Sequence, residues 1–194
     1  MTTFLLVRHG STDWVGKGLA GRLPGVGLDA AGRIQAQEVA KRLAGRPISA
    51  IYSSPVQRAV ETAEPLASTL GLPIQTREAF TEIDFGAWQG MQLADLEGDA
   101  HWRRFNMLPG SVQAPGGELL LQVQARMAME LDNLRQQHRK ETVAVFSHAD
   151  VIKSALMLYL NMPLDTHLRL EISPASLSVL QLADWGPRIL AVNS

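Results

Sequence analysis

Short apolar segments alternate with helical patterns along most of this chain, and that alternation limits the fold more than any other feature. Phe4–Val7, Ile48–Tyr52 and Thr142–Phe146 are short, apolar and followed by polar residues, which is typical of buried strands. Apolar residues recur at helical spacing from Asp29 to Gly45 and from Pro55 to Gly71. Alternating strands and helices predict an α/β fold, a three-layer sandwich with a mostly parallel central sheet and helices on both faces. The remaining pattern adds a short strand and two more helices: Ile74–Thr76, Leu120–Leu134 and Val151–Leu160.

The C-terminal part of the chain changes character. Leu168–Ile172, Leu177–Leu182 and Arg188–Val192 have the pattern of strands with no helix between them, which predicts antiparallel strands at the edge of the sheet. The stretch from Phe80 to Pro115 has no sustained period, and we expect an excursion with short helices there. Since the chain has 194 residues, 46% of them hydrophobic, and no internal repeat or linker, we predict one domain over residues 1–194.

Composition excludes several classes of function. The net charge is -1 and mean hydropathy is zero, without the excess of lysine and arginine that nucleic acid or an anionic membrane surface would require. The absence of cysteine excludes disulfides, thiolate chemistry and cysteine-ligated metals. No stretch approaches the roughly 20 apolar residues of a membrane span, and the first residues lack a basic leader. We therefore expect a cytoplasmic protein without nucleic-acid or membrane partners. The oligomeric state stays open, a homodimer being one alternative.

Residues able to do chemistry follow three of the expected strands. Arg8 and His9 follow the first strand, Arg58 comes shortly after the second, and His148 follows the strand that ends near residue 146. Functional residues of an open α/β sheet gather beyond the carboxyl ends of its strands. We therefore expect these side chains to converge on one crevice with Glu82, which lies at the start of the irregular excursion.

This combination of residue types suits phosphoryl transfer. A neutral imidazole, here His9, is a competent nucleophile toward phosphorus. The guanidinium groups of Arg8 and Arg58 match phosphoryl oxygens, and His148, if protonated, adds another donor. Glu82 could protonate the departing alkoxide and then deprotonate the attacking water. Each residue alone also fits a structural or solvated role, so the chemical interpretation depends on their convergence.

The segment Leu6–Thr12 resembles the signature of the histidine phosphatase superfamily, the phosphoglycerate mutase-like proteins. Similar motifs follow in the family's order along nearly the whole chain: Leu28–Gly32, Ser53–Ala59, Glu82–Gly86, Pro115–Glu118 and Ser147–His148. The resemblance implies that His9 is the phosphorylated nucleophile, that Glu82 is the proton donor and acceptor, and that no metal or organic cofactor is needed. We predict a small-molecule phosphate ester as the substrate, with these binding residues: Arg8, Arg58, His148, Gly10, Thr12 and Arg22.

The sequence departs from the family pattern after the second histidine. Ala149 and Asp150 follow His148, where the family usually has glycine. Asp150 is either a favourable charge in the first turn of a helix or a pocket residue that disfavours very anionic substrates. The usual Gly-Glu-Ser of the later loop ends in Leu119, which removes a polar contact or a helix cap.

The leading prediction is a phosphomonoester hydrolase acting on a small phosphorylated metabolite through phosphohistidine. Phosphoglycerate mutase-type transfer and an inactive phosphate-binding module are alternatives. A divalent-metal hydrolase using His9, Glu82 and His148 is a further alternative, which two nearby arginines disfavour because they repel a cation. Arg22, Arg103 and Arg104 would either bind a second anionic group of the substrate or be solvated charges.

Overall fold

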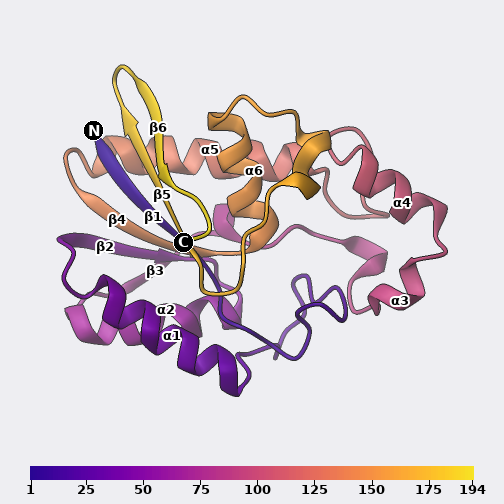
Figure 1. Ribbon diagram of the computed structural model, residues 1–194, viewed down its shortest axis with the longest axis horizontal. Coiled ribbons are helices and arrows are strands. Elements are labelled where there is room, and N and C mark those ends of the chain that lie inside the picture. Colours follow the sequence, from indigo (N-terminus) through magenta and orange to yellow (C-terminus); the bar gives the residue numbers. More distant parts are fainter.

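A six-stranded sheet forms the centre of the computed structural model, which describes residues 1–194 (Figure 1). The strand order is β3-β2-β4-β1-β5-β6. The first four of these run parallel to their neighbours, whereas β5 pairs antiparallel with both β1 and β6. The strand bounds are β1 Thr2–Arg8, β2 Ile48–Ser53, β3 Ile74–Thr76, β4 Thr142–Ser147, β5 Leu177–Ala183 and β6 Gly186–Ala191. The mostly parallel sheet with antiparallel C-terminal strands at its edge is confirmed.

Helices cover both faces of the sheet, as predicted. Helices α1 (Ala30–Leu43) and α2 (Gln57–Leu70) lie on one face, and α5 (Leu120–Gln137) and α6 (Ala149–Tyr159) lie on the other (Figure 1). Asp29 begins α1 because its carboxylate accepts the backbone N–H of Gly32 at 2.6 Å.

Strand β1 shows how the sequence builds two cores. Phe4 and Leu6 pack into the larger cluster beneath α5 and α6, while Leu5 and Val7 pack into the smaller cluster beneath α1 and α2. All four side chains are fully buried. Successive side chains of a strand point to opposite faces, so a strand covered on both faces is apolar at every position. This explains the unbroken apolar run near the N-terminus.

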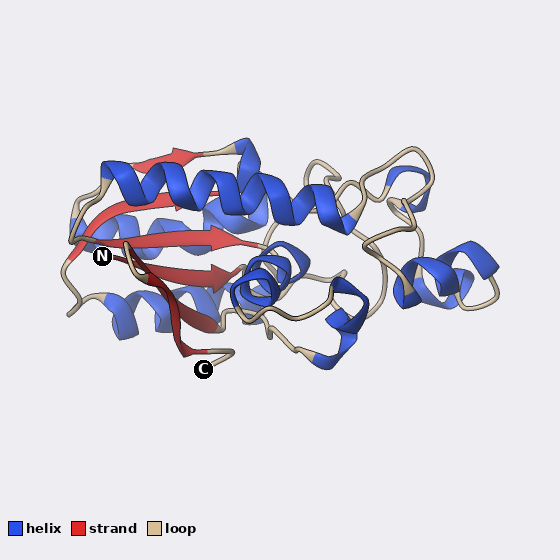
Figure 2. Ribbon diagram, turned by 90° about the horizontal axis from the view of Figure 1, so that it is seen from above, coloured by secondary structure: helices blue, strands red, loops and turns tan.

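The irregular excursion does contain short helices. After the 3-10 turns η1 (Glu78–Phe80) and η2 (Gly86–Trp88) come α3 (Leu93–Leu96) and α4 (Ala100–Met107). Figure 2 shows this part of the chain extending past the ends of the strand arrows, where the parallel strands finish. It has its own aromatic packing, in which the ring of Trp88 lies 5.3 Å from Trp102 and 5.4 Å from Phe105. The excursion therefore adjoins the carboxyl edge of the sheet.

One expected strand is wrong. Residues 168–172 do not pair with the sheet, because the segment begins as a 3-10 helix, η3 (Leu164–Arg169), in which Leu170 N–H donates to the His167 carbonyl at 3.3 Å. The alternation of leucines that indicated a strand does not mark a buried face, since Leu168 is 69% exposed. None of the helices is both long enough and apolar enough to cross a bilayer.

Candidate active site

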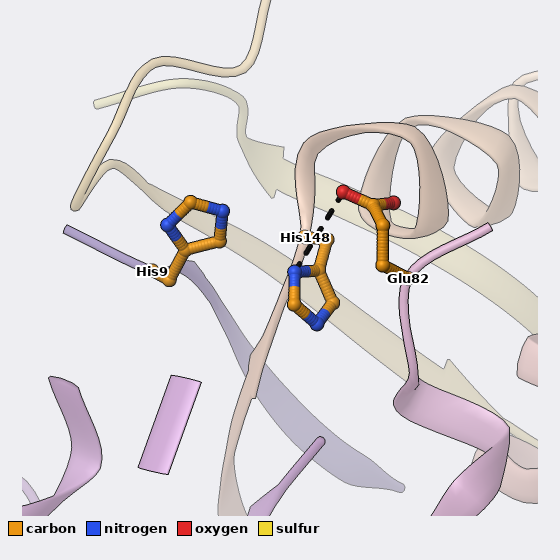
Figure 3. Close-up of side chains that lie close together, drawn as sticks. All are labelled: His9, Glu82 and His148. Atoms are coloured by element: carbon orange, nitrogen blue, oxygen red, sulfur yellow. Dashed lines mark ion pairs between the residues drawn. The ribbon is translucent and has the colours of Figure 1, made fainter. Parts of the chain in front are cut away.

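The ends of the parallel strands bring the two predicted histidines together. The backbone N–H of His9 donates to the Ser147 carbonyl at 2.9 Å, which joins the carboxyl ends of β1 and β4. The ring centroids of His9 and His148 are 5.2 Å apart. Figure 3 shows these rings beside the carboxylate of Glu82, which reaches them from the excursion. The expected convergence of side chains on one crevice is therefore what the structure contains.

Two glycines fix the backbone around His9. A Cβ on Gly32 would lie 2.1 Å from the Ser11 carbonyl oxygen, so only glycine lets the first turn of α1 approach this loop so closely. The N–H of Gly10 donates to Thr62 Oγ1 of α2 at 3.0 Å. The loop that carries His9 is thus held by both helices on that face of the sheet.

The hydrogen bonds of His9 define which nitrogen is free to react. Nδ1 lies 2.7 Å from the Gly10 carbonyl, which only accepts, so Nδ1 carries the proton. Nε2 is then unprotonated, and it accepts a hydrogen bond from Arg58 Nε at 3.1 Å. Burial, followed by the charge of Arg58, lowers the pKa of His9 well below its ordinary value. His9 is therefore a neutral imidazole whose Nε2 lone pair faces the arginine.

Both predicted arginines retain an unpartnered N–H. Arg58 is 2% exposed; its Nη2 donates to the Gly21 carbonyl at 2.8 Å and to His148 Nδ1 at 3.2 Å, but its Nη1 has no partner. Arg8 Nη1 donates to the Ile172 carbonyl at 2.6 Å, and its Nε has no partner. A buried donor without an acceptor is costly. These two donors suit an anionic ligand.

His148 is neutral in this geometry. Because its Nδ1 accepts from Arg58, its Nε2 carries the proton and donates to Ser54 Oγ at 2.8 Å. Complete burial, together with Arg58, lowers the pKa of His148 well below its ordinary value. The role expected for a protonated His148 therefore requires a phosphoryl dianion nearby, whose charge would raise this pKa.

The carboxyl group of Glu82 is buried and lies close to both Arg58 and His148. Its Oε2 is 3.7 Å from His148 Nδ1 and 3.8 Å from Arg58 Nη2, and its Oε1 accepts the N–H of Ile83 at 3.0 Å. Burial, and after it the negative charge of Asp150, raises the pKa of Glu82 to about 7. A carboxyl group with that pKa populates both protonation states near neutral pH, which suits a general acid and base.

A network that sequence reasoning missed holds the backbone of Glu82. Arg22 Nε and Arg126 Nη2 both donate to the Glu82 carbonyl, at 2.8 and 3.3 Å. The same two guanidinium groups contact Glu118 Oε2 at 2.7 and 3.2 Å. Arg22 is thus directed toward Glu118 and not toward the pocket. Arg126 lies on an amphipathic helix, where the sequence gives no sign that separates it from a solvated charge.

The pocket has a volume of about 140 Å³. Five predicted site residues line it: Arg8, His9, Thr12, Arg58 and Glu82. Gly10 and His148 are buried and are not part of the lining. Arg22, Arg103 and Arg104 are not part of it either, and the last two are exposed. Asp150 lies in the first turn of α6 and also lines the pocket, so its two expected positions do not exclude each other, and its effect on anionic substrates stays a prediction.

The ligand atoms of His9, Glu82 and His148 lie within 4.8 Å of one another, which is close enough to hold a metal ion. Arg58, however, donates to His9 Nε2 and His148 Nδ1, the nitrogens nearest to that position. A cation would have to replace these hydrogen bonds beside a buried guanidinium, which repels it. This donor set fits an anion better than a metal.

Comparison with known proteins places this geometry in context. Residues 4–194 match the family model described as the histidine phosphatase superfamily, branch 1. The chain is 30% identical over 195 residues to phosphoserine phosphatase 1 of Hydrogenobacter thermophilus, covering 100% of this chain and 92% of that protein. It is 34% identical over 195 residues to a bifunctional protein of Mycobacterium tuberculosis, covering 99% of this chain but only 54% of that relative's length.

Among solved structures, the fold is similar to that of a histidine-to-alanine mutant of phosphoserine phosphatase from Entamoeba histolytica in complex with phosphoserine. The TM-score is 0.88 at 29% identity, and the match covers 100% of this chain and 98% of the other.

Proposed function

The chain belongs to the histidine phosphatase superfamily, and on that basis we propose that it hydrolyses a small phosphate monoester through a phosphohistidine intermediate. The observation that carries the proposal is the state of His9. Its proton is fixed on Nδ1 by the Gly10 carbonyl, and its Nε2 lone pair faces Arg58 within a buried cationic setting.

In the first half-reaction, the lone pair of His9 Nε2 forms a bond to phosphorus while the bond between phosphorus and the ester oxygen breaks. Arg58 Nε exchanges its hydrogen bond with His9 for one to a phosphoryl oxygen, and the unpartnered Arg58 Nη1 and Arg8 Nε supply further donors. Protonated Glu82 gives its proton to the departing alkoxide. The products are phosphorylated His9 and a free alcohol.

In the second half-reaction, the Glu82 carboxylate removes a proton from water as the water oxygen attacks phosphorus. The bond between nitrogen and phosphorus breaks, and Nε2 recovers its lone pair. Inorganic phosphate leaves, and Glu82 is again protonated for the next turnover. A pKa of about 7 lets the same carboxyl group serve in both directions.

Rapid quenching after brief incubation with a labelled phosphate ester tests the intermediate. We expect an acid-labile, base-stable phosphoryl adduct. The substitution His9→Ala should abolish this adduct and lower the turnover rate by a factor of at least ~10³. His101→Ala is the matched control, because His101 is exposed and lies outside the pocket. Full activity of the His9→Ala enzyme would exclude the mechanism.

Chelation separates this proposal from the metal alternative. Activity should survive EDTA, and vanadate should inhibit by mimicking the five-coordinate transition state. Activity that EDTA removes and a single divalent ion restores would instead favour a metal held by His9, Glu82 and His148.

A further inference from the structure

Two cationic and two acidic residues line the pocket. Arg8 and Arg58 are the only cationic residues of the lining, and the proposed function assigns both to the transferring phosphoryl group. Glu82 and Asp150 are its two carboxylates. The rest of the wall is largely apolar and includes these side chains: Trp14, Val15, Leu19, Ala20, Phe85 and Ala149. A second anionic group of a substrate would therefore meet no cation here.

Arg22, the nearest alternative partner for such an anion, is already engaged. Its guanidinium contacts Glu118 Oε2 at 2.7 Å and the Glu82 carbonyl at 2.8 Å, and it lies outside the lining. Recruiting it would break an ion pair that positions Glu82.

Asp150 differs from the aspartates that cap helices in this chain. Asp29 and Asp99 accept backbone N–H groups at the starts of α1 and α4, at 2.6 and 2.7 Å. Asp150 lies in the first turn of α6. Its nearest cationic atom is Lys153 Nζ, 3.7 Å away, and its carboxylate accepts no hydrogen bond. Asp150 is therefore a pocket carboxylate whose acceptor capacity is unused.

The charge of Asp150 affects the pKa values of two other residues of the pocket, Glu82 and Arg8. It contributes to the raised pKa of Glu82 and opposes the lowering of the Arg8 pKa that burial causes. A substrate bound between Arg8 and Glu82 thus lies in the field of this carboxylate.

We propose that Asp150 is a specificity-determining residue that selects phosphate monoesters whose alcohol carries an ammonium group. The inference rests on the proposed function, which places the phosphoryl group on the two arginines. The apolar wall would contact the carbon chain of the alcohol, and Asp150 would accept the ammonium hydrogens. A carboxylate or a second phosphate in the same position would face a like charge, and the cation nearest to Asp150, Lys153 Nζ at 3.7 Å, is not part of the pocket lining.

Three esters of similar size test the proposal: 2-aminoethyl phosphate, propyl phosphate and phosphoglycolate. They place an ammonium, a methyl and a carboxylate at the same distance from phosphorus. Calorimetric titration of the His9→Ala variant measures binding without turnover. We expect 2-aminoethyl phosphate to bind at least ~10-fold more tightly than phosphoglycolate, with propyl phosphate between them, a tenfold ratio being about 1.4 kcal/mol.

Removing the charge should remove the preference. In a His9→Ala, Asp150→Asn double variant, the ratio should fall below about 3-fold, since only the uncharged amide remains to contact either group. Asp184→Asn in the same background is the matched control, because Asp184 has a 93% exposed side chain that pairs with Arg135 away from the pocket. The control should keep the original ratio.

The outcomes separate the two proposals. Equal affinities, or preference for phosphoglycolate, while Asp150 is intact would overturn the inference even if the double variant failed to fold. An unchanged preference in a folded Asp150→Asn variant would overturn it as well. Failure of the proposed function has a different signature: the wild-type enzyme would release no phosphate from any of the three esters, although the binding series would still report on Asp150.

Discussion

Arg58 links the two histidines of the site to the backbone. One guanidinium donates to His9 Nε2, to His148 Nδ1 and to the Gly21 carbonyl, while Nη1 remains available. A lysine ammonium is a single point charge and does not reproduce this planar set of donors. Replacing Arg58 by lysine should therefore change the orientation of both rings, and with it the phosphate binding that we propose.

For Arg58→Lys we predict a loss in kcat/KM of at least ~10² even though the charge is kept. Steady-state hydrolysis of an aryl phosphate measures it. Arg46→Lys, at an exposed arginine, serves as the control and should be neutral. Near-normal activity of the lysine variant would mean that charge alone, without the guanidinium geometry, suffices at this position.

The raised pKa of Glu82 predicts how the rate of hydrolysis depends on pH. Burial raises its pKa to about 7, so the protonated form that donates to a leaving alkoxide predominates below that pH and is lost above it. The kcat/KM for an alkyl phosphate should therefore fall as pH rises through about 7. An aryl phosphate, which needs little protonation, should be much less affected. Glu82→Gln should abolish this difference in pH profile by slowing the alkyl ester selectively; equal losses on both esters would assign Glu82 to positioning alone.

The residues that sequence reasoning located are those that follow a predicted strand or belong to a recognisable motif. Arg8, His9 and Arg58 line the pocket as predicted, because strand ends at one edge of a parallel sheet meet in space. The support that Arg126 gives to Glu82 was not predictable, since it depends on how α5 crosses the excursion. The orientation of Asp150 stayed undecided in the sequence for the same reason: a first-turn residue can face either way.

At the scale of elements, the contact between α1 and the loop after β1 determines where His9 lies. A Cβ at Gly32 would be 2.1 Å from the Ser11 carbonyl oxygen, a distance that requires backbone movement. Since this loop begins with His9, the nucleophile that we propose, displacement of α1 should change the position of its ring.

We predict that Gly32→Ala lowers kcat at least ~10-fold and lowers the melting temperature, because misplacing a reacting atom by about 1 Å is costly. Gly45→Ala is a matched control: Gly45 lies beyond the same helix, and a Cβ there would meet no atom within 4 Å. Assays of turnover and thermal unfolding on both variants measure the effect. An active Gly32→Ala enzyme would show that the loop adapts without moving His9.

Elements were predictable where periodicity and burial agree. The middle residues of β1 and β4, Phe4–Val7 and Val143–Phe146, are apolar because both faces of these strands are covered, and α1 begins at a capping aspartate, Asp29. Residues 168–172 show the limit of such patterns. Alternating leucines resemble a half-buried strand, but Leu168 is exposed, and the segment supplies the Ile172 carbonyl to Arg8 instead. Whether such a segment forms a strand depends on its tertiary contacts, which the periodicity of the sequence does not reveal.

In the molecule as a whole, the sheet and the excursion each supply some of the residues of the site. The sheet edge supplies His9 and the residues around His148, whereas the excursion supplies Glu82, and the network of Arg22, Glu118 and Arg126 joins the two parts. The position of Glu82 relative to His9 therefore depends on contacts between segments that are distant in sequence. This explains why each motif was recognisable in the sequence, whereas the contacts of Arg22, Glu118 and Arg126 that connect the motifs were not.

The distribution of charge over the whole site also distinguishes hydrolysis from a mutase reaction. A phosphoglycerate mutase must hold a bisphosphate while its phosphohistidine is kept from water, which requires further anion-binding groups. In this pocket the proposed mechanism assigns both arginines to one phosphoryl group, and Asp150 adds a negative charge to the same lining. Hydrolysis of simple monoesters should therefore exceed isomerisation of 3-phosphoglycerate to its 2-isomer by at least ~10-fold. Phosphorus NMR of one reaction mixture measures both rates, with and without bisphosphate. Isomerisation that is faster than phosphate release and depends on bisphosphate priming would establish the mutase alternative instead.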